Sequence, residues 1–483
     1  MVSIHTVWQR SFDFFADKPI VVEPSAGQLT SDAGLLPIRQ FDERVGLTEQ
    51  FAEALHDSRH QPFVDHPLPE MVRMRIYGIL ADYADQNDHD VLRSDPVFKL
   101  IVGRSPEDDD LASQPTLSRF ENMIDIDSFW RLQDVLIDQF IASFETPPTR
   151  LTFDIDAFDD PTHGQQQLTF FHGYYDQYQY LPRVITCADN DQVVMLCLLH
   201  GTAHAALGAD DDLEYLVERL RAVWPDVEIE LRADSGFAVP AMYEACERLG
   251  VWYTFGLKLN AVLKRNSDSL LADALQAYEQ TGRKQRLFRS FWYRAASWPQ
   301  LRYTIVKCEA HAQGTNRRAV VTNRPGAPVL PGATYDEYAE RGESENRNKE
   351  LKCGLHADRL SDHRYLANLF RLYLHTTALN LLVRLRREVA DPPLADPPDD
   401  LPAEALAEPE RRRYFNRRRE RDPLGEGHPC TWQTRLIKVA AEITTSARRV
   451  LVRLSNSWPY LNHYHHVSGV ALGITPLIPP KPG

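Results

Sequence analysis

The stretch RLTFDIDAF, residues 150–158, alternates apolar and polar side chains, as a β-strand with one face in a core does. Three further segments follow it in an order typical of an α/β core. DQVVMLCLLHG (191–201) has the pattern of a buried strand, DDLEYLVERLRAVW (211–224) that of an amphipathic helix, and VEIELRADSGF (227–237) that of a strand ending in a turn. The pattern predicts an α/β core whose first part spans residues 147–256.

The sequence on either side of this core divides into further regions. Upstream of Pro147 and Pro148, apolar residues recur three and four apart, which predicts helices. Downstream, the chain becomes β-rich and aromatic before helical patterns resume. The predicted regions are a helical N-terminal region (1–146), a β-rich insertion (257–330), a returning part of the core (331–390), an acidic, Pro-rich linker with an arginine-rich run (391–431), and a C-terminal segment (432–483).

Length and charge limit the classes of protein to consider. A chain of 483 residues exceeds what one hydrophobic core usually serves, so two or more structural units are expected. The formal net charge is -14, but it is uneven: from Arg341 to the end there are 23 Lys and Arg against 17 Asp and Glu. The acidic total therefore weakens the case for a nucleic-acid partner. It does not exclude one, because the basic groups are concentrated in the C-terminal third.

Targeting and cysteine patterns point to an ordinary cytoplasmic protein. The start MVSIHTVWQR lacks a cationic region followed by an apolar run, and no stretch approaches the roughly 18 apolar residues of a membrane span. We therefore expect a cytoplasmic location and no membrane partner. The six cysteines are scattered without a CxxC pair, which argues against a disulfide framework and against a structural zinc site.

Carboxylates gather at the ends of the predicted strands. Asp154 and Asp156 are two residues apart on one strand, so both point to the same face, and Asp234 ends another strand before a Ser-Gly turn. Like charges on a central strand are costly unless something neutralises them, and a divalent cation does so. Taken alone, an Asp at a strand end is more often a turn former or a cap.

A second polar pattern lies in YAERGESENRNKELK, residues 338–352. If this segment is one helix, Tyr338, Arg341, Glu345 and Lys352 fall within an arc of about 60°. A face that combines aromatic, cationic and anionic groups suits a phosphate and a metal ion, so Asp156, Asp234 and Glu345 are candidate anchors of one metal site. The alternative for Arg341 and Lys352 is ordinary surface pairing with Glu345 and its neighbours.

These residues carry a resemblance to a known family. The chain resembles the DDE transposases of bacterial insertion sequences, in the class related to insertion sequence 4 and most closely the insertion sequence 1380 family. The signature Y-x2-R-x3-E-x6-K of that class matches residues 338–352 without a gap. Further matching blocks are SDAGLLPIRQFDERVGL (31–47), DDPTHGQQQ (159–167), FFHGYYDQYQYLP (170–182) and RADSGFA (232–238).

The resemblance implies a fold and a site. The implied fold is α/β, an RNase H-like catalytic core with a β-rich insertion, preceded by a helical N-terminal DNA-binding and dimerisation region. The implied cofactors are two Mg²⁺ or Mn²⁺ ions held by Asp156, Asp234 and Glu345, with Tyr338, Arg341 and Lys352 contacting DNA phosphates. Phe158 stands where the family commonly has a small hydroxyl residue, so Asp154 remains an alternative to Asp156 as the first ligand.

The resemblance also implies an activity and partners. The expected activity is metal-dependent cleavage at terminal inverted repeats followed by strand transfer into target DNA, performed by a homodimer on DNA. One alternative is an RNase H-like nuclease that cuts without joining. Another is a catalytically inactive, transposase-derived DNA-binding protein.

Three other segments allow two interpretations each. FFHGYYDQYQY (170–180) could stack on bases or pack its rings into the core. Trp292, Tyr293 and Trp298 could grip a flipped base or serve as core residues. RRRYFNRRRERD (411–422) holds seven arginines and could contact phosphates or act as a solvated tether.

Overall fold

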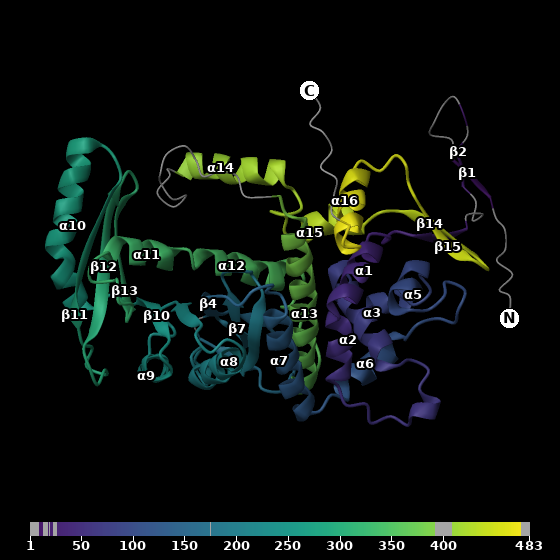
Figure 1. Cartoon of the computed structure of the whole chain (residues 1–483), viewed down its shortest axis with the longest axis horizontal. Coiled ribbons are helices and arrows are strands. Elements are labelled where there is room, and N and C mark those ends of the chain that lie inside the picture. Colours follow the sequence, from purple (N-terminus) through teal and green to yellow (C-terminus); the bar gives the residue numbers. More distant parts are fainter. Residues whose placement is uncertain are drawn as a thin grey trace.

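The computed structural model describes most of the chain as an elongated α/β molecule (Figure 1). The described residues are 9–12, 18, 20–22, 27–173, 175–391 and 408–474. Residues 392–407 of the predicted linker region (391–431) lie outside them. None of the helices in these ranges is long and apolar enough to cross a membrane.

A mixed central sheet forms the core that the strand patterns predicted. Its strands are β4 (Arg150–Ala157), β5 (Asp160–Pro161), β6 (Phe170–His172), β7 (Gln177–Cys187), β8 (Val193–His200), β9 (Glu228–Ala233) and β10 (Trp252–Leu257). β4, β9 and β10 run parallel, while β7 pairs antiparallel with β4 and β8. Helices α8 (Ala209–Val223) and α9 (Pro240–Leu249) connect the parallel strands, because parallel neighbours need a crossover.

The parallel register sets the positions of the acidic residues. Asp154 pairs with Arg232 and Ile155 with Ala233 across β4 and β9. Asp156 and Asp234 follow at the same C-terminal edge of the sheet. Two carboxylates that are 78 positions apart along the chain therefore become neighbours through strand pairing alone.

The insertion continues the central sheet and adds a long helix. It contains α10 (Ala261–Thr281), β11 (Gln285–Tyr293), β12 (Arg302–His311) and β13 (Gly314–Thr322). The three strands form an antiparallel meander, and β13 joins it to β10. Sequence analysis predicted the strands but not α10, which packs Leu270 and Ala274 against Val306 and Cys308 of β12. In Figure 1 this unit lies at the opposite end of the molecule from the N-terminal helices.

The N-terminal helices share a core with the C-terminal part of the chain. The helices are α1 (Leu35–Val45), α2 (Leu47–Glu53), α3 (Leu68–Leu80), α4 (His89–Leu92), α5 (Pro96–Val102), α6 (Gln114–Asn122) and α7 (Ile126–Ile141). The 25-residue α13 (Tyr365–Val389) is buried on nearly all sides and stands between these helices and the sheet (Figure 1). One hydrophobic cluster contains Phe41, Tyr77, Phe370 and Trp432.

The remaining elements come from the two ends of the chain. β1 (Arg10–Phe12) and β2 (Ile20–Val22) form a small ribbon, and β3 (Gln28–Thr30) pairs with the hairpin β14 (Ala441–Ser446) and β15 (Arg449–Leu454). α14 (Glu408–Arg421), α15 (Pro429–Trp432) and α16 (Leu461–Ala471) complete the C-terminal part. The strands β3 and β14 therefore connect the two ends of the described chain.

Candidate active site

Three carboxylates and one arginine meet at the C-terminal edge of the sheet. Asp156 is the second-last residue of β4, Asp234 follows β9, and Glu345 lies on α12 (Gly342–Lys349). Arg341 lies between two of them, with Nη1 3.6 Å from Asp156 Oδ2 and Nη2 3.2 Å from Glu345 Oε1. The fold thus brings together acidic groups from three separate segments around one guanidinium.

The helix that carries the signature is not continuous, which corrects the single helix assumed for residues 338–352. Tyr338 lies on α11 (Pro331–Ala339), and the chain passes into α12 through short-range bonds from Arg341 N to Tyr338 O and from Ser344 N to Arg341 O. After α12, residues 350–354 form a π-helical turn. A π turn adds a residue to the helical repeat, so side chains beyond it rotate away from the face that precedes it.

Lys352 lies on that π-helical turn and points to a different partner. Its Nζ lies 2.8 Å from Asp159 Oδ1, just beyond the end of β4. Asp159 also accepts a hydrogen bond of 3.1 Å from Gln177 Nε2 at the start of β7. Lys352 is therefore displaced toward β7. The other three signature residues stay near the two aspartates: Tyr338, Arg341 and Glu345.

Burial and mutual repulsion raise the pKa of Asp156 to about 6. Burial is the largest cause, and the negative charges of Asp234 and Glu345 act in the same direction. The positive charge of Arg341 and the backbone N–H of Ala157 oppose the rise. The three carboxylates thus act on one another electrostatically, and a cation among them would relieve the repulsion.

Tyr338 is partly buried beside the same cluster. Burial raises the pKa of its hydroxyl, Arg341 opposes this rise, and the charge of Asp234 adds to it. The hydroxyl lies so close to β10 that a Cβ on Gly256 would be 2.7 Å from its oxygen. Glycine at position 256 therefore makes room for Tyr338 to reach the edge of the sheet.

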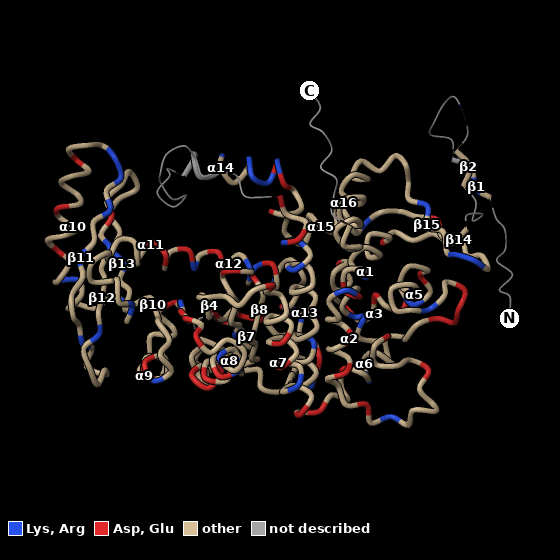
Figure 2. The backbone as a smooth tube through the Cα atoms, in the orientation of Figure 1, with Lys and Arg blue, Asp and Glu red and all other residues tan. Residues whose placement is uncertain are grey.

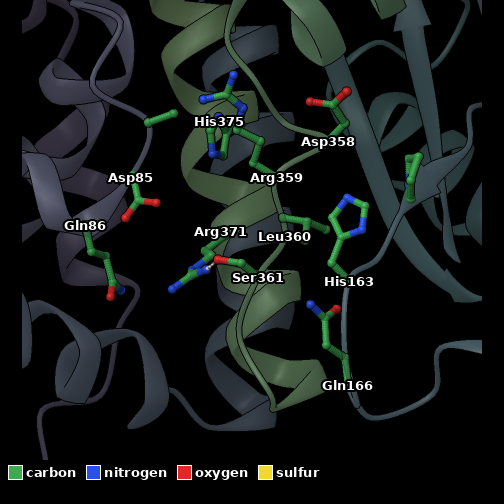
Figure 3. Close-up of a pocket in the computed structure, with 12 residues that line it drawn as sticks. Asp85, Gln86, His163, Gln166, Asp358, Arg359, Leu360, Ser361, Arg371 and His375 are labelled. Atoms are coloured by element: carbon green, nitrogen blue, oxygen red, sulfur yellow. Dashed lines mark hydrogen bonds between the residues drawn. The ribbon is translucent and has the colours of Figure 1, made fainter. Parts of the chain in front are cut away.

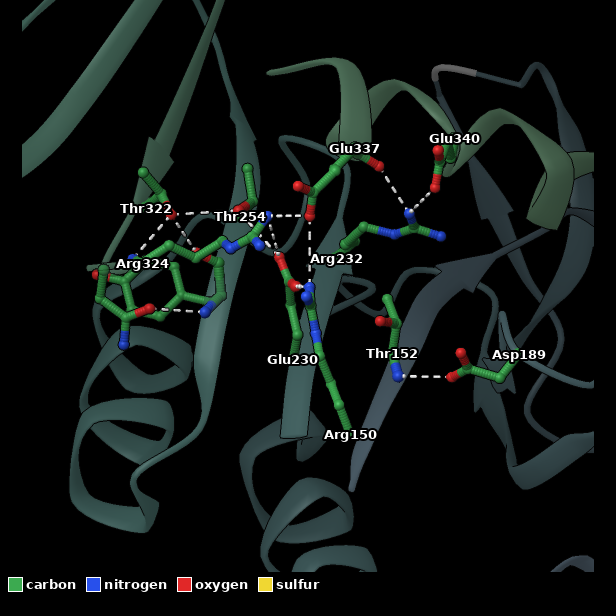
Figure 4. A network of polar contacts seen from close by, with 12 residues as sticks. Arg150, Thr152, Asp189, Glu230, Arg232, Thr254, Thr322, Arg324, Glu337 and Glu340 are labelled. Atoms are coloured by element: carbon green, nitrogen blue, oxygen red, sulfur yellow. Dashed lines mark hydrogen bonds and ion pairs between the residues drawn. The ribbon is translucent and has the colours of Figure 1, made fainter. Parts of the chain in front are cut away.

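Asp154 serves a different purpose from Asp156. Its carboxylate is buried and accepts two hydrogen bonds, of 2.7 and 2.8 Å, from Nε and Nη2 of Arg232. Arg232 also donates to the backbone oxygen of Glu337 at 2.6 Å, and Glu337 forms ion pairs with Arg150 and Arg324 (Figure 4). This network fixes α11, and with it Tyr338, against the parallel strands.

Replacing Asp154 by asparagine is expected to destabilise the protein by about 3 kcal/mol, because it leaves the buried Arg232 guanidinium without its bidentate partner. Urea unfolding of the variant beside wild type measures this loss. The folded fraction should retain the DNA cleavage of the wild type, since Asp154 has no contact with Arg341 or Glu345, and the contacts of Glu337 with Arg150, Arg232 and Arg324 still hold α11 in place. A well-folded Asp154→Asn protein without cleavage would instead assign the first ligand to Asp154.

Asn348 is a site residue that sequence analysis missed. Its Nδ2 donates a hydrogen bond of 3.0 Å to Asp156 Oδ2, the same oxygen that faces Arg341. Asn348 follows Glu345 by three residues, so both lie on one face of α12. That helical spacing was the signal available in the sequence.

The aromatic segment 170–180 is divided between surface and core. Phe170, Phe171 and Tyr178 are between 44% and 57% exposed, whereas Tyr180 is fully buried. In the insertion, Trp292 is 65% exposed and Tyr293 and Trp298 are buried in the core. Each of the two segments thus contains exposed rings, which could stack on bases, and buried rings, which pack in the core.

A separate pocket of about 350 Å³ lies between the N-terminal helices and α13 (Figure 3). Asp85, His163, Asp358 and His375 line it, and Arg371 donates a hydrogen bond of 2.7 Å to Ser361 within it. None of the six predicted site residues lines this pocket. It is therefore distinct from the carboxylate cluster.

The donor set of the cluster suits a hard divalent cation. Three carboxylates supply the oxygen ligands that Mg²⁺ and Mn²⁺ prefer. Arg341 occupies the position between two of them and neutralises part of their charge. Within the part of the chain that the structure describes, no three His, Cys, Asp or Glu side chains are arranged as a ready metal-ligand group.

Comparison with known proteins identifies the family. The family described as transposase DDE domain group 1 matches residues 12–395. This chain belongs to that family. Membership implies nuclease and strand-transfer chemistry in general, and DDE domains generally use divalent metals. No curated protein matched the chain.

A solved transposase structure is also similar to part of the chain. It is the cryo-EM structure of a piggyBac transposase synaptic complex with hairpin DNA, 12% identical in sequence with a TM-score of 0.39. The similarity covers 74% of this chain and 75% of that one.

Proposed function

We propose that this chain is the transposase of a bacterial insertion sequence, most closely of the insertion sequence 1380 family. It would cut DNA at the terminal inverted repeats of its element and join the freed 3' ends to target DNA. The observation that carries the proposal is the convergence of Asp156, Asp234 and Glu345 around Arg341. The family match over most of the chain supports the same reaction class.

The proposed ligands of two divalent ions are Asp156, Asp234 and Glu345. When bound, such ions supply charge stabilisation for the attacking and leaving oxygens of an in-line phosphodiester displacement. The chain itself contributes orientation. Asn348 holds Asp156 by its 3.0 Å hydrogen bond, and the backbone N–H of Gly236 holds Asp234 by a 2.7 Å bond.

Arg341, Tyr338 and Lys352 are the proposed phosphate contacts. Arg341 can exchange its carboxylate partners for phosphate oxygens, because its guanidinium fork matches both. The Tyr338 hydroxyl can donate to a phosphate at the same edge. Lys352, 2.8 Å from Asp159, would hold a phosphate farther along the strand as a point charge.

The proposed partners are the two ends of the element and a target duplex. Joining two ends in one reaction requires that they be brought together, so we propose a homodimer assembled on DNA. No covalent protein intermediate is needed, because water and then the freed 3'-hydroxyl serve as the nucleophiles.

Glutamine in place of Glu345 is expected to lower DNA cleavage at least about a hundredfold, because it removes one charged ligand of the proposed ions. The assay combines purified protein, Mg²⁺ or Mn²⁺, and a labelled DNA carrying the coding gene with its native flanks. It measures cutting at the flanking repeats and joining of the 3' ends to a plasmid. Glu343→Gln is the matched control, since Glu343 is an exposed residue on the same helix.

The outcomes separate the alternatives. Cutting and joining by wild type and Glu343→Gln, lost in Glu345→Gln, would support the transposase. Cutting without joining would favour a nuclease. Site-specific binding without cutting in any of the three proteins would favour an inactive DNA-binding protein.

A further inference from the structure

One face of α14 carries three exposed arginines at regular intervals. Arg413, Arg417 and Arg421 are four residues apart and exposed, and together they form what we term the arginine stripe. On an α-helix this spacing turns about 40° per step, so the stripe spans an arc of about 80° with a rise of about 6 Å between neighbours. Figure 2 shows basic residues toward the C-terminal end of α14.

Two other described arginines of α14 lie off the stripe. Arg419 is also exposed, but at 100° per residue it lies about 200° around the helix from Arg417. Arg418 lies off the stripe, forms an ion pair with Glu426 and stacks over the ring of Tyr414 at 5.8 Å. Residues 408–421 contain seven arginines and three glutamates, a net charge of +4 in a chain of -14. A run of this charge on an exposed helix suits a polyanion, because like charges this close repel unless a counter-charge is present.

The turn after α14 is hydrogen-bonded to α13 and to the residues just beyond it. Asp422, the residue after α14, accepts a hydrogen bond of 2.8 Å from Asp391 N beyond α13. Gly427 O accepts one of 3.1 Å from Arg386 on α13. Asp422 and Gly427 therefore connect the turn after α14 directly to α13.

A buried glutamate connects this turn to the proposed site. Glu350 lies on the π-helical turn between Glu345 and Lys352 and accepts hydrogen bonds from Arg347, Arg386 and His428 at 2.7, 2.9 and 2.7 Å. We term these four residues the Glu350 hub. His428 follows the turn after α14. The hub therefore holds the C-terminal end of α14 near α12, the helix that carries Glu345. The arginine-rich run is therefore an anchored helix and not a free tether.

We propose that the arginine stripe binds the phosphate backbone of the DNA duplex held at the active site. The inference rests on the proposed function and adds a second contact surface to it. Arginine forks pair with phosphate oxygens through charge-assisted hydrogen bonds. The contact is independent of base sequence, because phosphates carry no sequence information. It positions the duplex that the carboxylate cluster cuts.

The test removes the stripe by the triple change Arg413→Gln, Arg417→Gln and Arg421→Gln. Glutamine keeps a helix propensity close to that of arginine, and an unchanged thermal unfolding midpoint confirms the fold. The probe is a fluorescent duplex carrying one flank of the gene, with a scrambled duplex of equal length beside it. Anisotropy titrations at several salt concentrations give the slope of log affinity against log salt.

The expected result is a shallower salt slope, reduced by about 2 to 3 for three lost phosphate contacts, with both duplexes affected alike. The triple lysine variant should keep the wild-type slope, since it keeps the charge. Arg418→Gln should also keep it, because Arg418 lies off the stripe.

Two outcomes would overturn the proposal: an unchanged slope in the triple glutamine variant, or an equal loss in the triple lysine variant. Failure of the proposed function is recognised separately, as absence of cutting by wild type in the Glu345→Gln assay. The binding slopes do not depend on that cutting.

Discussion

Asparagine in place of Asp156 is expected to lower the rate of DNA cleavage by about a thousandfold or more while leaving folding and DNA binding intact. A loss of about 4 kcal/mol of transition-state stabilisation corresponds to this factor. The effect should exceed that of Glu345→Gln, because the Asp156 side chain is 18% exposed and that of Glu345 is 53% exposed. Electrostatic interactions are stronger where less water screens them.

The measurement compares single-turnover cleavage of a flank-carrying duplex by wild type, Asp156→Asn and Asp154→Asn at equal folded concentration. Asp154→Asn is the matched control, since it removes a carboxylate from the same strand two residues away. Urea unfolding should place Asp156→Asn near wild type and Asp154→Asn well below it. Cleavage by Asp156→Asn within about tenfold of wild type would remove Asp156 from the proposed ligands.

Alanine in place of Glu350 is expected to destabilise the protein by about 3 to 5 kcal/mol. The Glu350 side chain is 2% exposed and joins Arg347, Arg386 and His428, so its removal leaves buried positive charge without a partner. Urea unfolding measures the loss. Glu343→Ala on the exposed part of α12 should change stability by less than about 0.5 kcal/mol.

The pH dependence of stability gives an independent check on the Glu350 hub. Burial raises the pKa of Glu350, but the hydrogen bond from His428 and the charges of Arg386 and Arg347 outweigh it and lower the pKa from 4.5 to about 2. A depressed pKa contributes stability above the unfolded value, and this contribution is lost as pH falls from about 4.5 toward 2. Roughly 3 kcal/mol of acid-sensitive stability should therefore disappear in Glu350→Gln. Identical acid-unfolding curves for wild type and Glu350→Gln would contradict the stabilising role of the Glu350 hub.

The sheet and the acidic residues at its edge could be predicted from local patterns. The alternation in residues 150–158 predicted β4, and the apolar run ending at Asp234 predicted β9. Helix α10 was missed, because strand-like aromatic segments on both sides dominated the interpretation of the insertion. Local signals for this helix were present, since Asn260 caps its N-terminus and Gly282, with a φ of 63°, ends it.

The candidate site shows where local periodicity stops being informative. A constant 100° per residue placed Lys352 on the face of Glu345, but a break after Ala339 and a π-helical turn at 350–354 rotate it to Asp159. Glu350, the first residue of the π-helical turn, forms buried ion pairs with Arg347 and Arg386, and neither the turn nor these partners follow from a constant helical repeat. The spacing of Asn348 from Glu345 was visible in the sequence, but its hydrogen bond to Asp156 depends on how α12 packs on β4.

By itself the sequence determined the residue types, their spacing and the strands that carry them, since alternation and helical repeats are properties of neighbouring residues. Only the tertiary structure decided that Asp154 neutralises Arg232 while Asp156 faces Arg341. Only the tertiary structure placed the turn after α14 beside the π-helical turn that follows α12, through the contact between His428 and Glu350, which are 78 positions apart. Both outcomes depend on which distant charge each buried group meets, because a buried charge is stable only where a partner compensates its lost hydration.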